Sequence, residues 1–437
     1  MTTPRHRPVH YPPGQALLAM YRRYGPVINA GIGRRGYTHL LGPEANRFVF
    51  ANADAFSWAK TFENLAIVDG PTALIVSDGD DHRRRRSVVA PGLRHHQIRD
   101  YLPTMVANID RVIDDWHHGQ RLDIYRHCRG AVRRSTVESL FGPRLAAHAD
   151  FLGEHLQPLL DLTHQLPQVV SLQQRLRAPA WRRALAARQR LNDFIDAQVA
   201  QARAQPRPDD NLLTMLIAGR GEEGYALGDN EIRDSIISLI TAGYETTSGA
   251  LAWSIYTLLS LPGAWQRAAD EVRRVLGDRP PGSWAADLAS LTYLNGVVQE
   301  TLRLYSPAVI SARRVVRDLD FDGHPIRAGR LLIFSAYVTH RLPEVWPHPD
   351  EFRPERWDPQ GPQYRKPAPH EFIPFSAGLH RCVGSVMATM EMTAMLARLV
   401  TRTTLRLPAQ RIRAANLAAL SPKPGLIVDV DGLMPAQ

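Results

Sequence analysis

The 437-residue sequence contains only two cysteines, Cys128 and Cys382. A disulfide framework, a four-cysteine zinc site and a cysteine-ligated iron–sulfur cluster all need more cysteines than that. We therefore exclude these three classes, and we expect a reduced protein located in the cytoplasm.

Long apolar runs are also missing. Residues 1–11 carry prolines, histidines and arginines but no apolar core, so we expect neither a signal peptide nor a membrane anchor there. The longest uncharged run, residues 246–266, contains Pro262 and Gly263 and follows Glu245 directly. That composition predicts a buried core helix and not a membrane span.

Lysine is scarce, because only 3 of the 53 basic residues are lysines and the others are arginines. The net charge is nevertheless +10. A basic balance suits nucleic acid, an anionic membrane or an acidic protein partner. No nucleic-acid motif occurs, and apart from residues 83–86 the basic residues are spread along the chain. We therefore expect no nucleic-acid partner and favour a positive face that docks an acidic protein.

Helical periodicity dominates, and no repeat or linker divides the chain, so we predict one domain over residues 1–437 with a short arm at 1–12. Asp229 is the predicted N-cap of a long helix that ends before Pro262, and some thirty residues of helix span roughly 45 Å. The other predicted segments are β-like runs at 26–30 and 37–41, helices over 82–204, a break at 205–210, a helix at 287–305, strands at 313–316 and 331–334, an irregular stretch at 342–369 and a last helix at 383–401.

Cys382 lies just before the last predicted helix, where backbone N–H groups and the helix dipole stabilise a thiolate. Gly378 permits a tight turn with positive φ, and Gly384 lets the helix backbone lie close to a flat group. Phe375 would pack beside the sulfur and exclude water. A buried structural cysteine is the alternative, but an aromatic residue, two glycines and a histidine at these spacings favour a thiolate that binds a metal.

Polar residues interrupt the middle of the long helix at Glu245, Thr246 and Thr247. Burying a carboxylate and hydroxyls is costly without a purpose. A threonine hydroxyl can bond back to a carbonyl one turn earlier and open a kink, and Gly243 leaves room for a small ligand. These residues predict a groove with a proton source, with a hinge or an exposed polar patch as the alternative.

Both segments resemble motifs of the cytochrome P-450 family. The first is similar to the haem-binding signature F-x-x-G-x-[RH]-x-C-x-G, and it departs at Ser376, where the family most often has glycine. The second is similar to the oxygen-activation motif A-G-x-[DE]-T-T, which begins at Ala242 on the haem side. The resemblance implies haem b as cofactor, Cys382 as the axial ligand of its iron, Thr246 as the catalytic alcohol and Glu245 as its acid neighbour. The matching haem-binding positions are Phe375, Gly378, His380, Cys382 and Gly384.

Glu300 and Arg303 lie at i and i+3 on a predicted helix, which is the spacing of an ordinary surface pair. By resemblance to the family, these two residues and Arg356 form a buried charge triad that braces the haem side of the core. A buried triad is stable only if every charge has a partner, so loss of one member should cost several kcal/mol.

The two haem propionates need cations. By resemblance to the family, His82 and Arg86, at i and i+4 on one helical face, contact one propionate region. His380 and Arg313 match the other contacts, and the neighbouring Arg314 is the alternative to Arg313. We assign the three arginines between His82 and Arg86 to a solvated face.

Residues 31–36 fit the dinucleotide-binding pattern G-x-G-x-x-G, with Asp54 near the expected acidic position. A dinucleotide fingerprint must open a helix, whereas a β-like run follows here. We therefore predict a β-hairpin tip.

The resemblance covers nearly the whole chain. It implies a mostly α fold with a minor β portion, as a single, roughly triangular domain with the haem between the long distal helix and the helix after Cys382. It implies that a monomer inserts one oxygen atom from O2 into an organic substrate. Electrons must come from a separate ferredoxin or flavodoxin and its reductase, because the chain has no flavin domain and too few cysteines for an iron–sulfur cluster. A peroxide-driven peroxygenase and a non-catalytic haem-binding protein are the alternatives, and Glu245-Thr246 argues against both.

The stretches expected to line the substrate pocket are largely apolar, which favours a lipophilic substrate. They are residues 57–75, 151–170, 236–246, 308–312 and 418–421.

Overall fold

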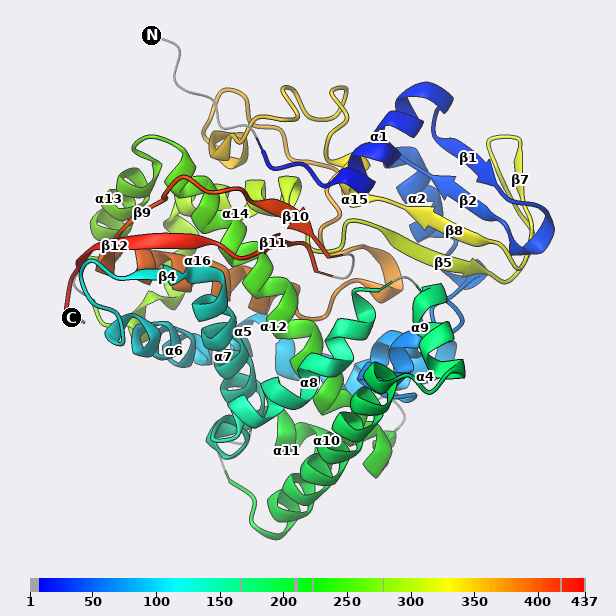
Figure 1. Cartoon of the computed structure of the whole chain (residues 1–437), viewed down its shortest axis with the longest axis horizontal. Coiled ribbons are helices and arrows are strands. Elements are labelled where there is room, and N and C mark those ends of the chain that lie inside the picture. Colours follow the sequence, from blue (N-terminus) through cyan, green and yellow to red (C-terminus); the bar gives the residue numbers. More distant parts are fainter. Residues whose placement is uncertain are drawn as a thin grey trace. The chain divides into compact units, whose positions relative to one another are not determined.

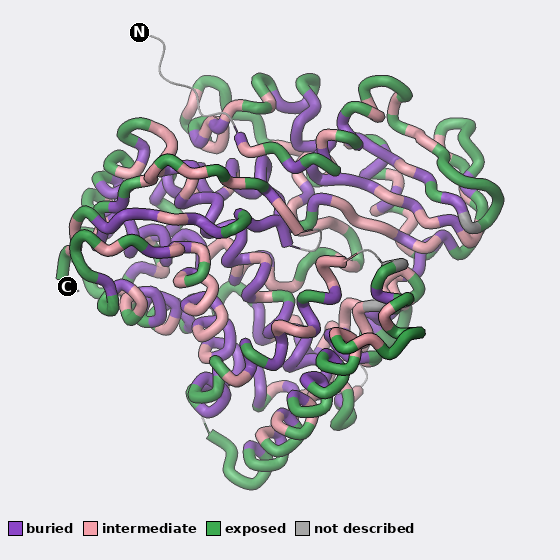
Figure 2. The backbone as a smooth tube through the Cα atoms, viewed as in Figure 1, coloured by how far each residue is buried: buried purple, intermediate pink, exposed green. Residues whose placement is uncertain are grey.

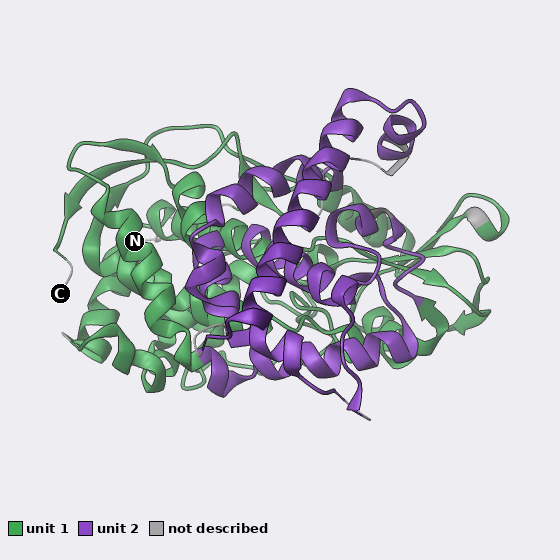
Figure 3. Ribbon diagram, turned by 90° about the horizontal axis from the view of Figure 1, so that it is seen from below, with its two compact units in different colours: residues 1–56, 99–132, 246–437 green, residues 57–98, 133–245 purple. Residues whose placement is uncertain are grey.

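The computed structural model of the chain describes residues 8–165, 167–207, 211–221, 224–277, 279–416 and 419–435, without the side chains of Arg35, Asn64, Pro167 and Gln168. The predicted arm at 1–12 and break at 205–210 therefore lie partly outside the described residues. The chain divides into two compact units, drawn in green and purple in Figure 3. The first unit comprises residues 1–56, 99–132 and 246–437, and the second comprises residues 57–98 and 133–245. A single domain over 1–437 stays a prediction.

The chain passes from one unit to the other inside regular elements. The four boundaries fall within β3 (Phe56–Ser57), α5 (His95–Asp100), α7 (Ile124–Ala146) and α12 (Asp229–Ser260). Of these, α7 is kinked at Gly142, which has φ +77° and precedes Pro143.

The first unit combines helices with all but the short β3 of the strands (Figure 1). Its helices are α1 (Pro12–Tyr24), α2 (Pro43–Ala51), α6 (Leu102–Asp114), α13 (Ala264–Leu276), α14 (Thr292–Leu304), α15 (Ala336–Thr339) and α16 (Ser385–Arg402). Its strands are β1 (Val27–Ala30), β2 (Tyr37–Leu40), β4 (Arg121–Asp123), β5 (Ser311–Val315), β6 (Leu319–Phe321), β7 (His324–Ile326), β8 (Leu331–Phe334), β9 (Thr403–Arg406), β10 (Arg413–Ala415), β11 (Ser421–Lys423) and β12 (Ile427–Leu433).

The largest sheet has the strand order β1-β2-β8-β5-β3. Strands β1 and β2 are antiparallel, with Val27 opposite Leu40, and β2 runs parallel to β8, with Tyr37 beside Leu331. The segment between β1 and β2 contains a 3-10 turn, Gly33–Arg35, and not the start of an α-helix. The predicted β-hairpin tip is therefore confirmed.

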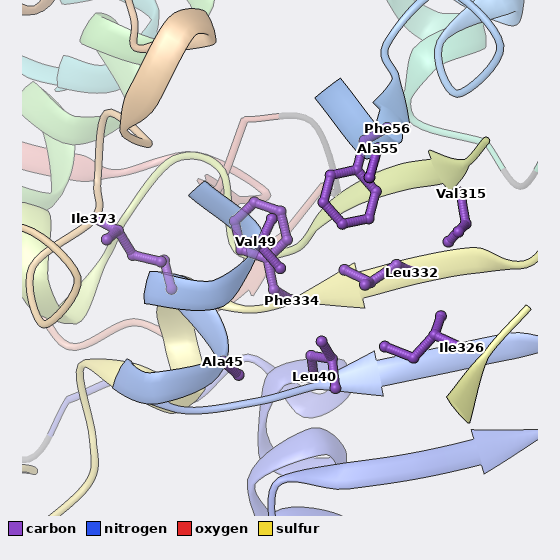
Figure 4. Packing of buried hydrophobic residues seen from close by; sticks show 11 residues of the cluster. Leu40, Ala45, Val49, Ala55, Phe56, Val315, Ile326, Leu332, Phe334 and Ile373 are labelled. Carbon is purple, nitrogen blue, oxygen red and sulfur yellow. The ribbon is translucent and has the colours of Figure 1, made fainter. Parts of the chain in front are cut away.

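One face of this sheet is closed by α2. Buried and accessible positions alternate along β2 and β8, as expected for strands with one covered face. Leu40 and Phe334 pack with Val49 of α2, and Ile373 from the segment that leads towards Cys382 joins the same cluster (Figure 4). The Cys382 segment thus starts from the hydrophobic core.

The second unit is helical. Its complete helices are α3 (Ala66–Asp69), α4 (Gly79–Val89), α8 (Ala149–Thr163), α9 (Pro167–Arg175), α10 (Pro179–Ala204) and α11 (Asn211–Ala218). Buried residues recur at intervals of three and four along α10, for example Ala184, Ala187, Leu191 and Ile195, and this face packs on α8.

The predicted long helix is confirmed as α12, with 32 residues, and Asp229 is its first helical residue. The predicted strands at 313–316 and 331–334 are confirmed as β5 and β8. The prediction of a helix from 287 is wrong, because 3-10 turns fill that region and α14 begins at Thr292. Strand β4 also interrupts the predicted helical stretch 82–204. Across the described residues, no helix has the length and apolar character needed to span a membrane.

Candidate functional site

A backbone hydrogen bond closes the loop that carries Cys382. The Cys382 N–H donates to the carbonyl oxygen of Phe375 at 2.9 Å. Gly378 has φ +70°, and a Cβ there would lie 3.4 Å from the carbonyl oxygen of Phe50. The turn therefore favours glycine at position 378. The loop ends at Gly384, the N-cap of α16, which directs the positive end of the helix dipole towards the loop.

Ser376, the departure from the family motif, has φ +56°. A residue with a Cβ is destabilised in this left-handed region by about 1 kcal/mol or more. The Ser376 hydroxyl is also buried and has no hydrogen-bond partner in the described part of the chain. Glycine would avoid both costs, so the departure carries a physical penalty that the motif alone does not reveal.

The two cysteines differ in accessibility. Cys382 is exposed, whereas Cys128 is buried in α7. Burial raises the pKa of the Cys128 thiol, because a thiolate there would lose its solvation. Apart from Gly384 itself and its two chain neighbours, no described protein atom lies within 4 Å of the place where a Cβ on Gly384 would stand. The start of α16 therefore has room for a flat group such as haem, and Cys382 is the cysteine that can reach it.

Most residues in the middle of α12 are buried, as the colours of the tube show (Figure 2), and the few accessible ones recur at helical spacing to form one stripe. Leu239, Gly243 and Thr246 are partly accessible and Ala242 is exposed, and their spacing places them on one helical face. Glu245, beside this stripe, is only 5% exposed. An accessible face built around two small residues fits a flat cofactor lying against the helix.

Gly243 packs closely against α7 on the side where a side chain would stand, and its room for a small ligand stays a prediction. A Cβ on Gly243 would lie 2.9 Å from the Cγ2 atom of Thr136 in α7. The missing side chain therefore allows α7 and α12 to pack closely within the second unit.

His82 and Arg86 lie one turn apart on α4. His82 is buried, and this burial together with the positive charge of Arg86 lowers its pKa to about 4. At neutral pH His82 is therefore an uncharged hydrogen-bond donor, and Arg86 carries the charge of this pair.

The other predicted propionate contacts belong to the first unit. Arg313 on β5 is buried, and its guanidinium lies 5.0 Å from the ring centre of Phe334. Arg314 is partly accessible and donates to a backbone carbonyl at 3.0 Å. His380 is the last residue of the 3-10 turn in the Cys382 loop. The choice between Arg313 and Arg314 stays a prediction.

The three arginines at positions 83–85 of α4 already have ion-pair partners, which the sequence alone did not indicate. Arg83 and Arg84 each pair with the aspartate three residues earlier, at 3.0 and 3.1 Å, and both remain accessible. The side chain of Arg85 is only 12% exposed and its Nε donates to Glu231 of α12 at 2.8 Å. The assignment of Arg85 to a solvated face is wrong, because its partner is drawn from a distant part of the chain.

Glu300 and Arg303 form a fully buried ion pair on α14. Arg303 donates through Nε and Nη2 to the two carboxylate oxygens, each at 2.8 Å. The same carboxylate accepts from Arg356 at 3.3 Å, from the Trp357 indole at 2.9 Å and from the Arg353 N–H at 3.0 Å. Burial alone would raise the pKa of Glu300, but the charge and hydrogen bonds of Arg303 lower it below its ordinary value. The carboxylate therefore stays ionised.

Comparison with known proteins decides the family. Residues 6–428 match the family described as cytochrome P-450. The chain is a cytochrome P-450. A cytochrome P-450 139 of Mycobacterium tuberculosis is 72% identical to it over 432 residues, which cover 98% of this chain and 100% of that protein. The cyclooctat-9-en-7-ol 5-monooxygenase of Streptomyces melanosporofaciens is 29% identical, over 89% of this chain and 84% of that protein.

The fold of this P-450 is similar to a solved structure. The retinoic-acid-bound cyanobacterial CYP120A1 matches with a TM-score of 0.85 at 24% identity, over 99% of this chain and 100% of that one. The predicted mostly helical P-450 fold is confirmed. Membership of the family implies a haem-thiolate cofactor and an oxygenase reaction, while the roles of individual residues stay predictions.

His340 connects two parts of this P-450 although it belongs to none of the sequence motifs described above. His340 Nδ1 lies 3.0 Å from the Arg303 carbonyl oxygen, and His340 Nε2 accepts from the Ile373 N–H at 2.9 Å. Burial and the charge of Arg303 lower the pKa of His340 to about 3, so the ring is neutral and carries its proton on Nδ1. His340 therefore joins the buried pair to the segment that leads into the Cys382 loop.

Proposed function

We propose that this P-450 inserts one oxygen atom of O2 into a lipophilic organic substrate and reduces the other oxygen atom to water. Substrate, O2, two electrons and two protons give hydroxylated product and water. The observation that carries the proposal is the accessible stripe of α12, which ends at Thr246 next to the buried Glu245. Haem supplies the oxygen-activating chemistry when it is bound.

Cys382 would hold the haem iron as a thiolate. The closed loop fixes its backbone, and the N-terminus of α16 favours negative charge on its sulfur. Phe375, in the same loop, would exclude water from the sulfur. The residues proposed to contact haem are His82, Arg86, Ala242, Arg313, Phe375, Gly378, His380 and Gly384.

Thr246 and Glu245 would handle the two protons. Thr246 lies on the accessible stripe, so its hydroxyl can hold a proton towards the reacting face. Glu245 is buried beside it and is an acid that can give up and regain a proton during each turnover. The chain thus separates the group that presents the proton from the group that replenishes it.

The apolar character of the predicted pocket stretches supports a lipophilic substrate. Leu239 lies on the accessible stripe, and Val309 and Leu420 are apolar members of two other stretches. Ala418, in the last stretch, lies outside the described residues. The relative named as a cyclooctat-9-en-7-ol 5-monooxygenase supports the same class of substrate.

The features of the chain favour an electron donor that is a separate protein. The sequence has too few cysteines for an iron–sulfur cluster, and its one dinucleotide-like pattern is a hairpin tip. An acidic ferredoxin or flavodoxin with its reductase would suit the net charge of +10. A monomer in the cytoplasm without a nucleic-acid partner stays our expectation.

The proton roles can be tested with Thr246→Ala. We expect reductant consumption to continue while product per electron falls, with the missing electrons recovered as hydrogen peroxide. Turnover driven by added hydrogen peroxide should suffer less, because it needs no proton delivery for reduction. Thr247→Ala, one position along, is the matched control and should keep full coupling. If Thr246→Ala keeps full coupling and Thr247→Ala loses it, the role belongs to the neighbouring hydroxyl.

The thiolate role can be tested by spectroscopy. The reduced protein with carbon monoxide should show the far-shifted Soret band of thiolate ligation, and Cys382→Ser should abolish it. Cys128→Ser is the control and should leave the band unchanged. A band that survives in Cys382→Ser would overturn the ligand assignment.

A further inference from the structure

A row of polar residues runs along one face of α12 in the second unit. Its members recur at intervals of three or four residues, so they point in nearly the same direction from the helix axis. The first member is exposed, whereas the four that follow are between 0% and 7% exposed. The polar row consists of Asn230, Asp234, Ser238, Thr241 and Glu245. It therefore leads from solvent at the start of α12 to the buried carboxyl group of Glu245.

The polar row is separate from the accessible stripe of the same helix. Successive residues of an α-helix are rotated by about 100°, which places Leu239 and Gly243 of the stripe on a different face from the row. Thr246, at the end of the stripe, follows Glu245 directly. The row thus reaches the predicted acid from inside the protein and not from the accessible face.

Buried polar side chains on a core helix are costly unless they have partners or a purpose. A threonine can bond back to a carbonyl one turn earlier, as the Thr241 hydroxyl does to the Ile237 carbonyl oxygen. Such a bond can form on any face of a helix, so it does not explain why two hydroxyls line up between Asp234 and Glu245. A hydroxyl can accept one hydrogen bond and donate another at the same time. Two hydroxyls between two carboxyl groups therefore have the order of a path for protons.

The outer end of the row has access to solvent and a supply of protons. The Thr72 hydroxyl is partly accessible and lies 2.6 Å from the Asp234 carboxylate and 3.2 Å from the Asn230 carbonyl oxygen. Asp69 is near enough for its charge to interact with that of Asp234, and burial raises the pKa of Asp69 to about 7. A carboxyl group with such a pKa gains and loses protons readily near neutrality.

We infer that the polar row is the route by which protons from solvent replenish Glu245. The Cβ atoms of residues one turn apart are about 5–6 Å apart, a separation that a single bound water can bridge. Ser238 and Thr241 each take a proton from the solvent side and pass on their own, so neither keeps a charge and Glu245 regains the proton that it gave up. This inference rests on the proposed function of Glu245 and adds two residues that transport its protons.

Consumption of O2 by the haem-loaded protein tests the route without the natural substrate, because reduction of O2 to hydrogen peroxide takes two electrons and two protons. An excess of a plant-type ferredoxin with its reductase and NADPH supplies the electrons, and rates are compared in ordinary and heavy water. Thr241→Val keeps the shape of the side chain and removes the hydroxyl, so the rate should fall by about tenfold or more. The ratio of the rates in ordinary and heavy water should rise, because proton entry becomes limiting. Ser238→Ala should behave in the same way, and Thr241→Ser, which restores a hydroxyl, should recover most of the rate.

Ser235→Ala is the matched control. Ser235 is also a buried serine of α12, at 3% exposed, but it lies about 100° around the helix from Asp234. Its rate should stay within about twofold of the original, because its hydroxyl is outside the row. Oxidation of guaiacol by added hydrogen peroxide shows whether each variant keeps an intact haem site. Peroxide brings its own protons, so this reaction should change much less in Thr241→Val than the consumption of O2.

Glu245→Gln separates this inference from the proposed function. It should slow O2 consumption at least as much as Thr241→Val, and the double variant should be no slower than Glu245→Gln alone, because both changes block one path. If Glu245→Gln is slow while Thr241→Val and Ser238→Ala keep the original rate, the polar row is not the route and the role of Glu245 stands. If Glu245→Gln keeps the original rate, the acid role and the route both fail.

Two further results would overturn the inference alone. One is a Ser235→Ala variant that is as slow as Thr241→Val. The other is an equal loss of both reactions in Thr241→Val, since the hydroxyl would then support only the fold of the site.

Discussion

Each of the two units contains a buried charge cluster, and these two clusters differ in charge balance. In the first unit a single carboxylate, Glu300, faces Arg303 and Arg356. In the second unit two buried carboxylates, Asp69 and Asp234, face Arg188. One cluster therefore has an excess of positive charge and the other an excess of negative charge.

The second cluster is built around Asp234 of α12. Its carboxylate accepts from Arg188 at 2.6 Å and from the Thr72 hydroxyl and N–H at 2.6 and 3.1 Å. Arg188 also donates to the Val68 carbonyl at 2.5 Å. Arg233 lies 3.7 Å from the same carboxylate but donates to an exposed aspartate. The cluster thus ties α3, α10 and α12 together.

The charge balance decides how each cluster titrates. Glu300 has a pKa below its ordinary value, because Arg303 and the other donors outweigh its burial. Burial raises the pKa of Asp69 to about 7. The positive charge of Arg188 works against this rise, and the negative charge of Asp234 adds to it. An excess of cations therefore makes a buried cluster indifferent to pH near neutrality, and an excess of carboxylates makes it responsive.

The largest effect is expected for Arg303→Ala. It leaves the buried Glu300 carboxylate without its bidentate partner, which should lower the free energy of unfolding by about 3–5 kcal/mol and leave little haem-loaded, soluble protein. Urea unfolding and the haem absorbance per protein measure both effects. Arg273→Ala is the control, because Arg273 forms an exposed pair with Asp270 at the same i, i+3 spacing; it should cost less than about 0.5 kcal/mol. Equal losses in the two variants would mean that burial of the pair is unimportant.

A smaller effect is expected for Arg188→Met. It removes the cation between two carboxylates, but Asp69 can keep its proton and Thr72 still donates to Asp234, so we expect a loss of about 2–3 kcal/mol at pH 7. The loss should shrink at pH 5, where Asp69 is protonated in the folded protein both with and without Arg188. Urea unfolding at both pH values measures this, with Arg190→Met on the exposed side of α10 as control. A loss that does not depend on pH would contradict the carboxylate excess.

A pH-dependent effect is expected for Asp69→Asn. The folded protein keeps the Asp69 proton up to about pH 7, whereas the unfolded chain releases it near its ordinary pKa of 3.8. The contribution of Asp69 therefore makes stability fall as pH rises from about 4 to 7, by at most about 1.4 kcal/mol per pH unit. Asp69→Asn should remove this decline and be the more stable protein at pH 8. Asp193→Asn, at an exposed site, should keep it.

The smallest effect is expected for substitution of Ser376. Its buried hydroxyl has no hydrogen-bond partner in the described part of the chain, whereas the carboxylates Glu300 and Asp234 of the two clusters accept several hydrogen bonds. Ser376→Gly removes the left-handed conformation of a residue with a Cβ and the buried hydroxyl, so the free energy of unfolding should rise by about 1 kcal/mol. Ser376→Ala removes the hydroxyl alone and should gain less. If both variants gain equally in denaturant titrations, the backbone conformation contributes nothing.

The two clusters also mark how far the sequence predicts the structure. Glu300 and Arg303 are close in sequence, so their pairing could be expected, and the Cys382 loop could be expected for the same reason. Arg188 and Asp234 come together only through packing of α10 on α12, and Arg85 finds Glu231 in the same way. No local pattern announces such pairs.

Helix α14 gives a physical reason for one wrong boundary. The predicted start was at Asp287, but the N–H groups of Tyr293 and Leu294 donate to the buried carboxylate of Glu271 in α13, both at 2.8 Å. A cap supplied by another helix thus fixes where α14 begins, and Asp287 pairs with Arg279 instead. Boundaries set by local residues were predictable, and boundaries set by tertiary partners were not.

The closed Cys382 loop has a consequence for assembly of the holoprotein. The loop is fixed at one end by Ile373 in the core and by His340, and at the other end by α16, and the hydrogen bond from Cys382 to Phe375 joins its two ends. Its conformational entropy is therefore lost when the chain folds and not when haem arrives. We therefore expect haem binding by the folded chain to require little further ordering of this loop, so that its rate would be set by the encounter of haem with the protein.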